Sequence, residues 1–170
     1  MNKLRMILAM DLEGGIGKKG TLPWHIPEDL KMFKEKTKDC FVVMGKNTWN
    51  DPTFPKPMKG RETIVFTRHF EDVDKRTLAD NILNVDFNNI PFYLDMFNGK
   101  DIWIIGGGKV YDIMIDHVDE VYLTQIYDNF DCDVFFDGSK LHSQFEIVSQ
   151  SQLKEYNGIE YNFQIHRRVK

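Results

Sequence analysis

Runs of apolar residues recur along the chain and predict the strands of a mostly parallel sheet. Several runs are unbroken rather than alternating, which is typical of strands buried on both faces. The runs are Met6–Met10, Phe41–Met44, Thr63–Phe66, Ile82–Phe87, Ile102–Ile105 and Val121–Ile126. Helical patterns lie between them at Pro27–Thr37, Lys46–Asn50, Asp72–Asp80, Pro91–Phe97 and Gly108–Ile115. Because strands and helices alternate, the pattern predicts an α/β layer fold.

The C-terminal part of the chain has a different pattern. Apolar and polar residues alternate from Ile159 to His166, which is the period of a strand with one solvated face. Another apolar run, Phe145–Gln150, precedes it, and Asn157-Gly158 supplies a turn between the two. We therefore expect an antiparallel hairpin at the edge of the sheet.

The length and composition predict one globular domain over residues 1–170. A chain of this length buries roughly 70% of the surface of its unfolded form. Its 42% hydrophobic and 28% charged residues are typical of a globular protein. The formal net charge is −4, whereas duplex-binding modules are normally basic, so nucleic acid is not an expected partner. A local basic patch for a small anion is compatible with this charge.

Two cysteines and a short N-terminal apolar run bear on the location of the protein. Cys40 and Cys132 are too few for a disulfide framework and have no partners at zinc spacing. We expect both to be small buried side chains in a reducing compartment, and we expect no metal site. Met6–Met10 is too short for a signal sequence or a membrane span. These features predict a cytoplasmic protein without a membrane partner.

Gly15 to Gly20 reproduces the dinucleotide fingerprint G-x-G-x-x-G, but its context does not fit. The fingerprint binds pyrophosphate because its glycine loop opens a helix. Here the loop continues into Leu22-Pro23-Trp24 and a second proline, Pro27, so no helix can begin inside it. We interpret the segment as a mobile glycine-rich loop, which beside a cleft can act as a lid.

Gly106-Gly107-Gly108 is better placed to bind an anion. The buried run Ile102–Ile105 precedes these glycines, and a helical pattern from Lys109 to Ile115 follows them. This order presents backbone N–H groups and a helix N-terminus to an anion. The alternative is a tight turn that needs positive φ. Phosphate binding and the tight turn both stay open at this point.

Hydrogen-bond donors also follow two other expected strands. Gly45-Lys46-Asn47-Thr48 opens a helix after Phe41–Met44, and Thr67-Arg68-His69 follows Thr63–Phe66. Ligands of open α/β sheets bind at the carboxyl ends of the strands. A basic residue there is often a solvated surface charge, but three strand ends that each offer donors suit a ligand with several phosphates.

Asp29 is the unusual residue of the expected helix Pro27–Thr37. Helical spacing places its carboxylate at the border of the apolar face, on the side of Met32 and Phe33. One interpretation is an acid that complements the helix dipole in the first turn. The other is a carboxylate in an apolar cleft, with a pKa raised by desolvation and able to bind a protonated heterocycle. Periodicity alone does not choose between them.

Taken in order along the chain, these motifs resemble the dihydrofolate reductase family. The residues that carry the resemblance are Ile7-Leu8-Ala9, Gly17, Leu22-Pro23-Trp24, Pro27-Glu28-Asp29-Leu30, Phe33, Thr37, Met44-Gly45-Lys46-x-Thr48-Trp49, Gly60-Arg61 and Ile105-Gly106-Gly107-Gly108-x-x-Tyr111. They cover Ile7 to about Thr124 closely and the remainder loosely. The resemblance implies a central eight-stranded, mostly parallel sheet with an antiparallel C-terminal strand and about four flanking helices.

The resemblance also implies NADPH-dependent reduction of 7,8-dihydrofolate to 5,6,7,8-tetrahydrofolate, in support of one-carbon metabolism and thymidylate synthesis. C6 receives the hydride and N5 the proton, with Asp29 as the acid and Trp24, Thr124 and Leu22 beside it. The implied substrate-binding residues are Ile7, Leu8, Asp29, Leu30, Phe33, Lys34, Pro52, Met58, Arg61, Ile105, Tyr111 and Thr124. Arg61 would hold the glutamate α-carboxylate. The implied partners of this monomer are dihydrofolate and antifolate-type inhibitors.

For the cofactor, the resemblance implies NADPH rather than NADH, because Lys46, Thr67 and Arg68 would meet the adenosine 2′-phosphate. The glycines of Gly106-Gly107-Gly108 would cradle the pyrophosphate, and Gly14 to Leu22 would lie over the nicotinamide as a flexible loop. The implied cofactor-binding residues are Ala9, Ile16, Gly17, Leu22, Gly45, Lys46, Thr48, Thr67, Arg68, Gly106, Gly107, Gly108, Lys109, Val110 and Tyr111.

Two other functions are alternatives to dihydrofolate reduction for the same motifs. A pyrimidine reductase of the riboflavin pathway has the same fold but would lack the combination of Trp24, Asp29 and Arg61. A noncatalytic nucleotide-binding module would have no reason to keep Asp29 and Arg61 beside a phosphate cradle. The chain also departs from the family pattern, since Lys46 stands where many members have arginine and Lys59 replaces a frequent proline.

Overall fold

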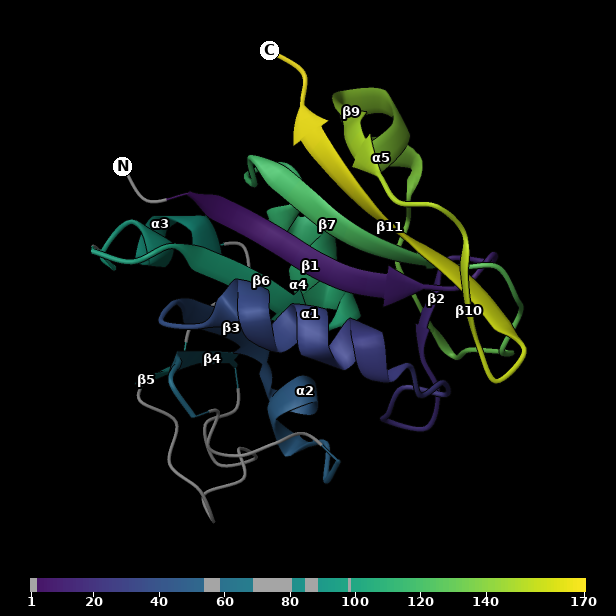
Figure 1. Ribbon diagram of the computed structural model, residues 1–170. Helices are drawn as coiled ribbons and strands as arrows, with labels where there is room; N and C mark the ends of the chain where they lie inside the picture. Colours follow the sequence, from purple (N-terminus) through teal and green to yellow (C-terminus); the bar gives the residue numbers. More distant parts are fainter. Residues whose placement is uncertain (1–2, 54–58, 69–80, 85–88, 98) are drawn as a thin grey trace.

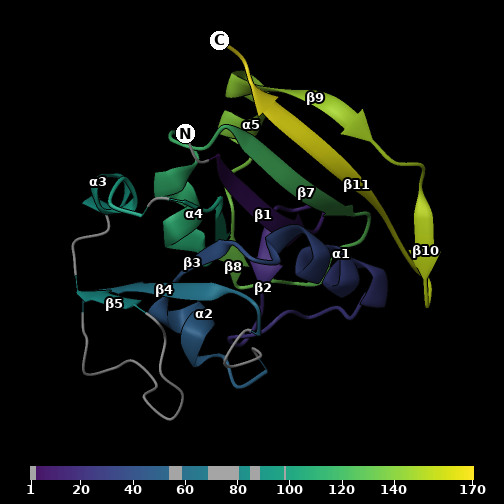
Figure 2. The same cartoon turned by 60° about the vertical axis from the view of Figure 1, so that its left-hand side comes forward.

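The chain forms one central sheet with helices against both faces (Figures 1 and 2). The computed structural model describes residues 3–53, 59–68, 81–84, 89–97 and 99–170. The strands are β1 (Leu4–Met10), β2 (Gly15–Gly17), β3 (Phe41–Gly45), β4 (Glu62–Thr67), β5 (Asn81–Asn84), β6 (Ile102–Gly106), β7 (Glu120–Ile126), β8 (Val134–Phe135), β9 (Phe145–Gln150), β10 (Lys154–Tyr156) and β11 (Ile159–Arg168). The helices are α1 (Pro27–Thr37), α2 (Lys46–Asn50), α3 (Ile90–Leu94), α4 (Gly108–Met114) and α5 (Ser139–Gln144).

The order of strands across the sheet is β10-β11-β7-β1-β6-β3-β4-β5. The strands from β7 to β5 in this order are all parallel, and β11 is antiparallel to β7. Both β9 and β10 pair with β11, at different positions along it, so the sheet is eight strands wide. The predicted eight-stranded, mostly parallel sheet with an antiparallel C-terminal strand is therefore confirmed.

Three details differ from the sequence prediction. Asn157 and Gly158, with φ of 48° and 80°, join β10 to β11, whereas the turn was expected to follow Phe145–Gln150 directly. Helix α5 was missed because its one buried residue, Leu141, creates no periodic pattern. Five helices are therefore described instead of about four. The helix expected at 72–80 lies outside the described residues.

Alternate residues of the central strands face opposite sides of the sheet, and both sides are buried. On β1, Met6 and Leu8 belong to the cluster that contains Met114 of α4. Ile7 belongs to a second cluster, against which Phe33 of α1 packs. Figures 1 and 2 show α1 and α2 over one face and α4 over the other. Burial on both faces explains why the apolar runs are unbroken.

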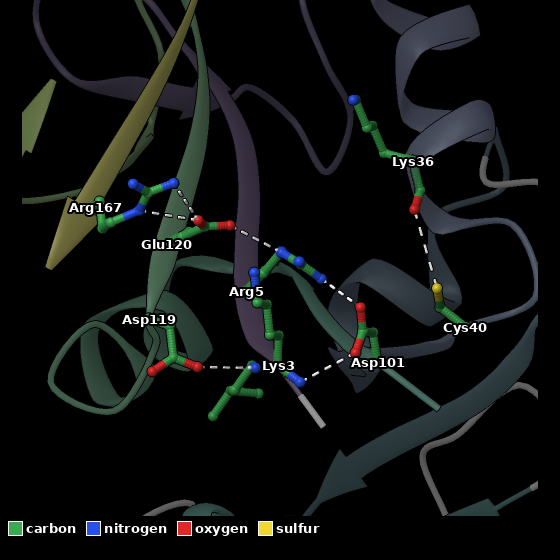
Figure 3. Close-up of polar contacts among 9 residues, drawn as sticks. Lys3, Arg5, Lys36, Cys40, Asp101, Asp119, Glu120 and Arg167 are labelled. Carbon is green, nitrogen blue, oxygen red and sulfur yellow. Dashed lines mark hydrogen bonds and ion pairs between the residues drawn. The ribbon is translucent and has the colours of Figure 1, made fainter. Parts of the chain in front are cut away.

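A network of charged groups joins the amino ends of β1 and β7 to the end of β11 (Figure 3). The Glu120 side chain, 7% exposed, accepts hydrogen bonds from Arg5 Nε at 3.0 Å and from Arg167 Nη2 at 3.1 Å. Arg5 Nη1 also donates to Asp101 Oδ2 at 2.6 Å. Burial alone would raise the pKa of Glu120, but the hydrogen bonds from Arg5 and Arg167 outweigh it and lower the pKa.

Replacing Glu120 by Gln is expected to lower the free energy of unfolding by about 2 to 3 kcal/mol at neutral pH, because Arg5 loses a buried charged partner. Since the folded pKa of Glu120 is lowered, the carboxylate stabilises the protein fully above its unfolded pKa and ceases to do so as the pH falls through the folded value. The difference between variant and wild type should therefore shrink below about pH 4. Urea unfolding at several pH values measures both effects.

Glu62→Gln is the matched control for this measurement. Glu62 pairs with Lys100, and both side chains are about 40% exposed, at 43% and 41%. An exposed pair contributes less than about 1 kcal/mol. Equal losses in the two variants would contradict a stabilising role for the buried network.

Candidate active site

A cavity of about 1190 Å³ opens at the carboxyl ends of β1, β3, β4 and β6. Helix α1 and the first turns of α2 and α4 continue its wall. Among the residues that the structure describes, every predicted site residue lines this cavity except Pro52 and Thr124. The structure thus brings together residues that are up to about a hundred positions apart in the chain, at the sheet edge where α/β proteins bind ligands.

Asp29 lies in the first turn of α1 with its side chain against β7. Thr124 Oγ1 donates a hydrogen bond of 2.6 Å to Asp29 Oδ1, as the resemblance implied. Burial raises the pKa of Asp29, the hydrogen bond from Thr124 opposes the rise, and the charge of Glu28 adds to it. Asp29 also lines the cavity, so it is surrounded by protein and still accessible to a ligand. The structure therefore favours a carboxylate in a cleft over a simple helix-dipole role.

The backbone carbonyl of Ile7 lies at the same end of the cavity. Ile7 O accepts a hydrogen bond of 2.8 Å from Tyr111 Oη. Burial raises the pKa of Tyr111, so its phenol stays protonated and remains the donor. A carbonyl has two lone pairs, so Ile7 O can accept a second hydrogen bond from a ligand.

Trp24 lies in the segment before α1 and also lines the cavity. Its side chain is buried and meets Phe130 edge-on, with ring centroids 5.3 Å apart. Its Nε1 is buried without a hydrogen-bond partner among the residues that the structure describes. Because a buried N–H without a partner is costly, this atom is suited to bind a ligand or an ordered water.

Arg61 and Lys34 supply positive charge near the C-terminal half of α1. Arg61 Nε donates to Thr37 Oγ1 at 2.7 Å, and its terminal nitrogens donate to the carbonyl oxygens of Lys59, at 2.5 Å, and Lys34. These bonds fix the orientation of the guanidinium at the cavity wall. A guanidinium has five N–H donors, so donors remain for a carboxylate.

Two helix N-termini face the same cavity. No side chain of the described residues caps the N-terminus of α2 or α4, and the first N–H groups of a helix have no partners within the helix itself. Gly106 precedes α4 with a φ of 135°, and its peptide bond to Gly107 is cis. A Cβ on Gly106 would lie in tight contact with Thr48 Oγ1, at 3.1 Å, and any other residue would be strained at this φ. These observations confirm a tight turn at the glycines, and their binding of a phosphate stays a prediction.

Basic residues gather beside this turn. Lys46 follows β3, and Thr67 and Arg68 end β4, the neighbour of β3 in the sheet. All three line the cavity, as does Lys109 of α4. Positive charge therefore lines the cavity in a chain whose net charge is −4.

The glycine-rich segment contains no helix, as predicted, but it has more regular structure than expected. β2 pairs with β8, and Lys18 forms a bridge with Thr21. Asp11, 1% exposed, accepts hydrogen bonds from the backbone N–H groups of Gly15 at 2.7 Å and Phe130 at 3.1 Å. Asp11 thereby ties the start of this segment to the chain that precedes β8.

Some predicted residues lie elsewhere. Pro52 is exposed in a turn after α2 and does not line the cavity, and Met58 lies outside the described residues, so both roles stay predictions. Cys132 is buried as expected, but Cys40 is only half-buried, and both thiols are free. Sequence reasoning missed cavity residues outside the predicted loop and strand-end motifs, namely His25, Ile26, Asp51, Thr53, Lys59 and Val134. No periodicity marks such positions.

The described part of the chain has two further properties. None of its helices has the length and apolar character needed to span a bilayer. Its His, Cys, Asp and Glu side chains form no group of three or more that could hold a metal ion.

The fold and the cavity define a class of protein. Parallel strands bring an acid in a cleft and a glycine turn before a helix to the wall of one cavity, an arrangement of α/β enzymes that use a nucleotide cofactor.

Comparison with known proteins identifies the family. The family model described as dihydrofolate reductase matches residues 3–168. A dihydrofolate reductase of Aedes albopictus is 30% identical in an alignment of 190 positions that covers 99% of each chain. Dihydrofolate reductase type 9 of Escherichia coli is 32% identical in an alignment of 170 positions that covers 97% of this chain and 93% of the other. This chain therefore belongs to the dihydrofolate reductase family, as the resemblance implied.

A solved structure agrees with this assignment. The dihydrofolate reductase from Enterococcus faecalis, complexed with NADP(H) and RAB-propyl, matches this fold with a TM-score of 0.80 and 32% sequence identity. The match covers 99% of this chain and 97% of that chain.

Proposed function

We propose that this protein reduces 7,8-dihydrofolate to 5,6,7,8-tetrahydrofolate with NADPH, and so supports one-carbon metabolism and thymidylate synthesis. The observation that carries the proposal is the hydrogen-bonded pair of Asp29 and Thr124, which places an acid in the same cavity as the glycine cradle before α4. Membership in the family supports the reaction, and the Enterococcus faecalis relative was solved with NADP(H).

The pterin ring would lie at the end of the cavity formed by Asp29, Trp24 and the carbonyl of Ile7. Leu30 of α1 is 41% exposed and lines the cavity, so its apolar side chain is available to the substrate. Arg61, at the wall of the same cavity, would bind the glutamate carboxylate. A pyrimidine substrate without a glutamate tail would not require both the acid and this guanidinium.

The residues at the other end fit a cofactor with several phosphates. The N-terminal turns of α2 and α4 would bind the pyrophosphate, and Lys46 and Arg68 would bind the 2′-phosphate. When bound, reduced nicotinamide supplies the hydride that C6 of the pterin accepts.

The chain's own acid would control the proton for N5. Asp29 Oδ1 accepts the hydrogen bond from Thr124, which leaves Oδ2 for the substrate. Because burial raises the pKa of Asp29, the carboxyl group holds a proton at higher pH than an exposed aspartate does. The unpartnered Nε1 of Trp24 would hold a water or a substrate atom beside this acid.

Mixing the purified protein with NADPH and dihydrofolate is expected to consume reduced nicotinamide and to form tetrahydrofolate. Loss of nicotinamide absorbance and chromatography of the product measure the reaction, with each reactant omitted in turn as a control. NADH is expected to be a much poorer reductant because it lacks the 2′-phosphate. Turnover no faster than the uncatalysed reaction would refute the proposed function.

A further inference from the structure

Glu28, the residue before Asp29, is held by two side chains of the C-terminal hairpin. Glu28 Oε2 accepts a hydrogen bond of 2.5 Å from Tyr161 Oη on β11, and Glu28 Oε1 pairs with Lys154 Nζ on β10 at 2.9 Å. Lys154 and Tyr161 lie directly opposite each other in the β10–β11 ladder, so their side chains share one face of the hairpin. Figures 1 and 2 show this hairpin beside the first turn of α1.

Strand β11 also contacts residues next to Asp29. Tyr161 is 2% exposed and belongs to the apolar cluster that contains Trp24 and Ile26, the residues that lead into α1. Two positions further along β11, Phe163 lies opposite Thr124 of β7. The first turn of α1 is therefore attached to β11 by Glu28 and to β7 by Asp29.

The charge of Glu28 acts on the carboxyl group of Asp29. In the described chain, the titratable groups that act electrostatically on Asp29 come from three elements: Glu28 of α1, Tyr111 of α4 and Tyr161 of β11. Burial raises the pKa of both phenols, so they remain neutral near pH 7. The groups of β7 and β1 nearest to the acid, Thr124 and Ile7, carry no charge. Lys34 and Arg61 also line the cavity and are unchanged in the variants below.

We propose that Glu28 is a positioning residue for the catalytic acid: held by Tyr161 and Lys154, its carboxylate fixes the first turn of α1 and sets the charge environment of Asp29. Lys154 has the opposite electrostatic effect on Asp29, because its positive ammonium group offsets the negative charge of Glu28. The consequence for catalysis rests on the proposed function, in which the proton of Asp29 is used.

The test is a titration of the Asp29 carboxyl carbon by NMR in the protein without ligands. Glu28→Gln is expected to lower the pKa of Asp29 by about half a unit, and Lys154→Met is expected to raise it by a smaller amount, as Coulomb interactions across a few ångströms of partly exposed surface predict. Both shifts should shrink at high ionic strength. Glu35→Gln is the matched control, because it removes the same charge from an exposed position about 10 Å further along α1.

The two substitutions must move the pKa in opposite directions, whereas a merely structural role would give no such pair of shifts. An unchanged pKa of Asp29 in Glu28→Gln, or an equal shift in Glu35→Gln, would overturn the inference. If the protein reduces dihydrofolate, the midpoint of its turnover against pH should follow the same two shifts. Absence of turnover in the wild type would refute the proposed function only, because the NMR titration does not depend on activity.

Discussion

Replacing Asp29 by Asn is expected to lower the turnover of dihydrofolate by about 100-fold or more at neutral pH, because positioned acids contribute at least this factor to proton transfer. Asn keeps the size of the side chain and can still accept the hydrogen bond from Thr124, but it cannot hold the proton. Steady-state rates of NADPH oxidation across pH measure the loss, with Glu35→Gln as a control for removal of an acid from the same helix.

The loss should be smaller at acidic pH, where the substrate arrives already protonated. In the wild type the rate should level off below the pKa of Asp29, which burial raises above its usual range. In Asp29→Asn the rate should keep rising as the pH falls. A variant with the wild-type pH profile would contradict the role of Asp29 as the acid.

The same substitution should stabilise the folded protein at neutral pH. Because the folded pKa of Asp29 is raised, the folded state binds the proton more tightly than the unfolded state, and stability falls as the pH rises from the unfolded pKa through the folded one. Above the folded pKa, Asn removes the loss of stability that comes from burying the charged carboxylate. Below the unfolded pKa the carboxyl group is neutral, so Asn does not increase stability there. Thermal unfolding should therefore be measured at one pH above the folded pKa and at one below the unfolded pKa. The variant should be more stable than the wild type only at the higher pH, as expected where function and stability conflict.

Replacing Lys46 and Arg68 together by Gln is expected to weaken the binding of NADPH by about 100-fold or more. The binding of NADH should weaken by only a few-fold. Each residue would lose a charge-assisted hydrogen bond to the 2′-phosphate, at about 1.5 to 3 kcal/mol each, whereas NADH has no phosphate at this position. Both residues line the same end of the cavity, at the ends of β3 and β4. Dissociation constants from quenching of protein fluorescence measure the ratio.

A double variant of Lys31 and Lys38 to Gln is the matched control for the cofactor experiment. It removes two positive charges from exposed positions of α1 and its C-cap that do not line the cavity. It should leave the preference for NADPH unchanged. If the Lys46 and Arg68 variant binds NADPH and NADH more weakly by the same factor, another part of the chain binds the 2′-phosphate.

Local patterns predicted the elements whose signals lie within a few residues. Helix α1 begins and ends at the expected residues, because Pro27 is favoured in the first helical turn and the apolar residues behind it recur at helical spacing. The central strands were found because burial on both faces produces unbroken apolar runs. In contrast, β10 and α5 are short and mostly polar, and their positions depend on pairing with β11 and on the burial of Leu141.

The role of Asp29 shows where local patterns stop. Its position in the first turn was compatible with two interpretations, and the choice came from Thr124, which is 95 residues away in the chain. The isolated motif Gly15 to Gly20 resembled a nucleotide fingerprint, but its neighbouring prolines excluded the helix that such a motif needs, and the structure pairs β2 with β8 instead.

The order of residues was thus sufficient for the fold class and the family, because these depend on local periodicity and on motifs in a fixed succession. Folding was needed to show that the acid, the glycine turn and the basic strand ends share one cavity, and that Glu28 is held by Tyr161 and Lys154. The physical reason is that burial, hydrogen bonds and charge interactions act through space, between groups that the sheet brings together from distant parts of the chain.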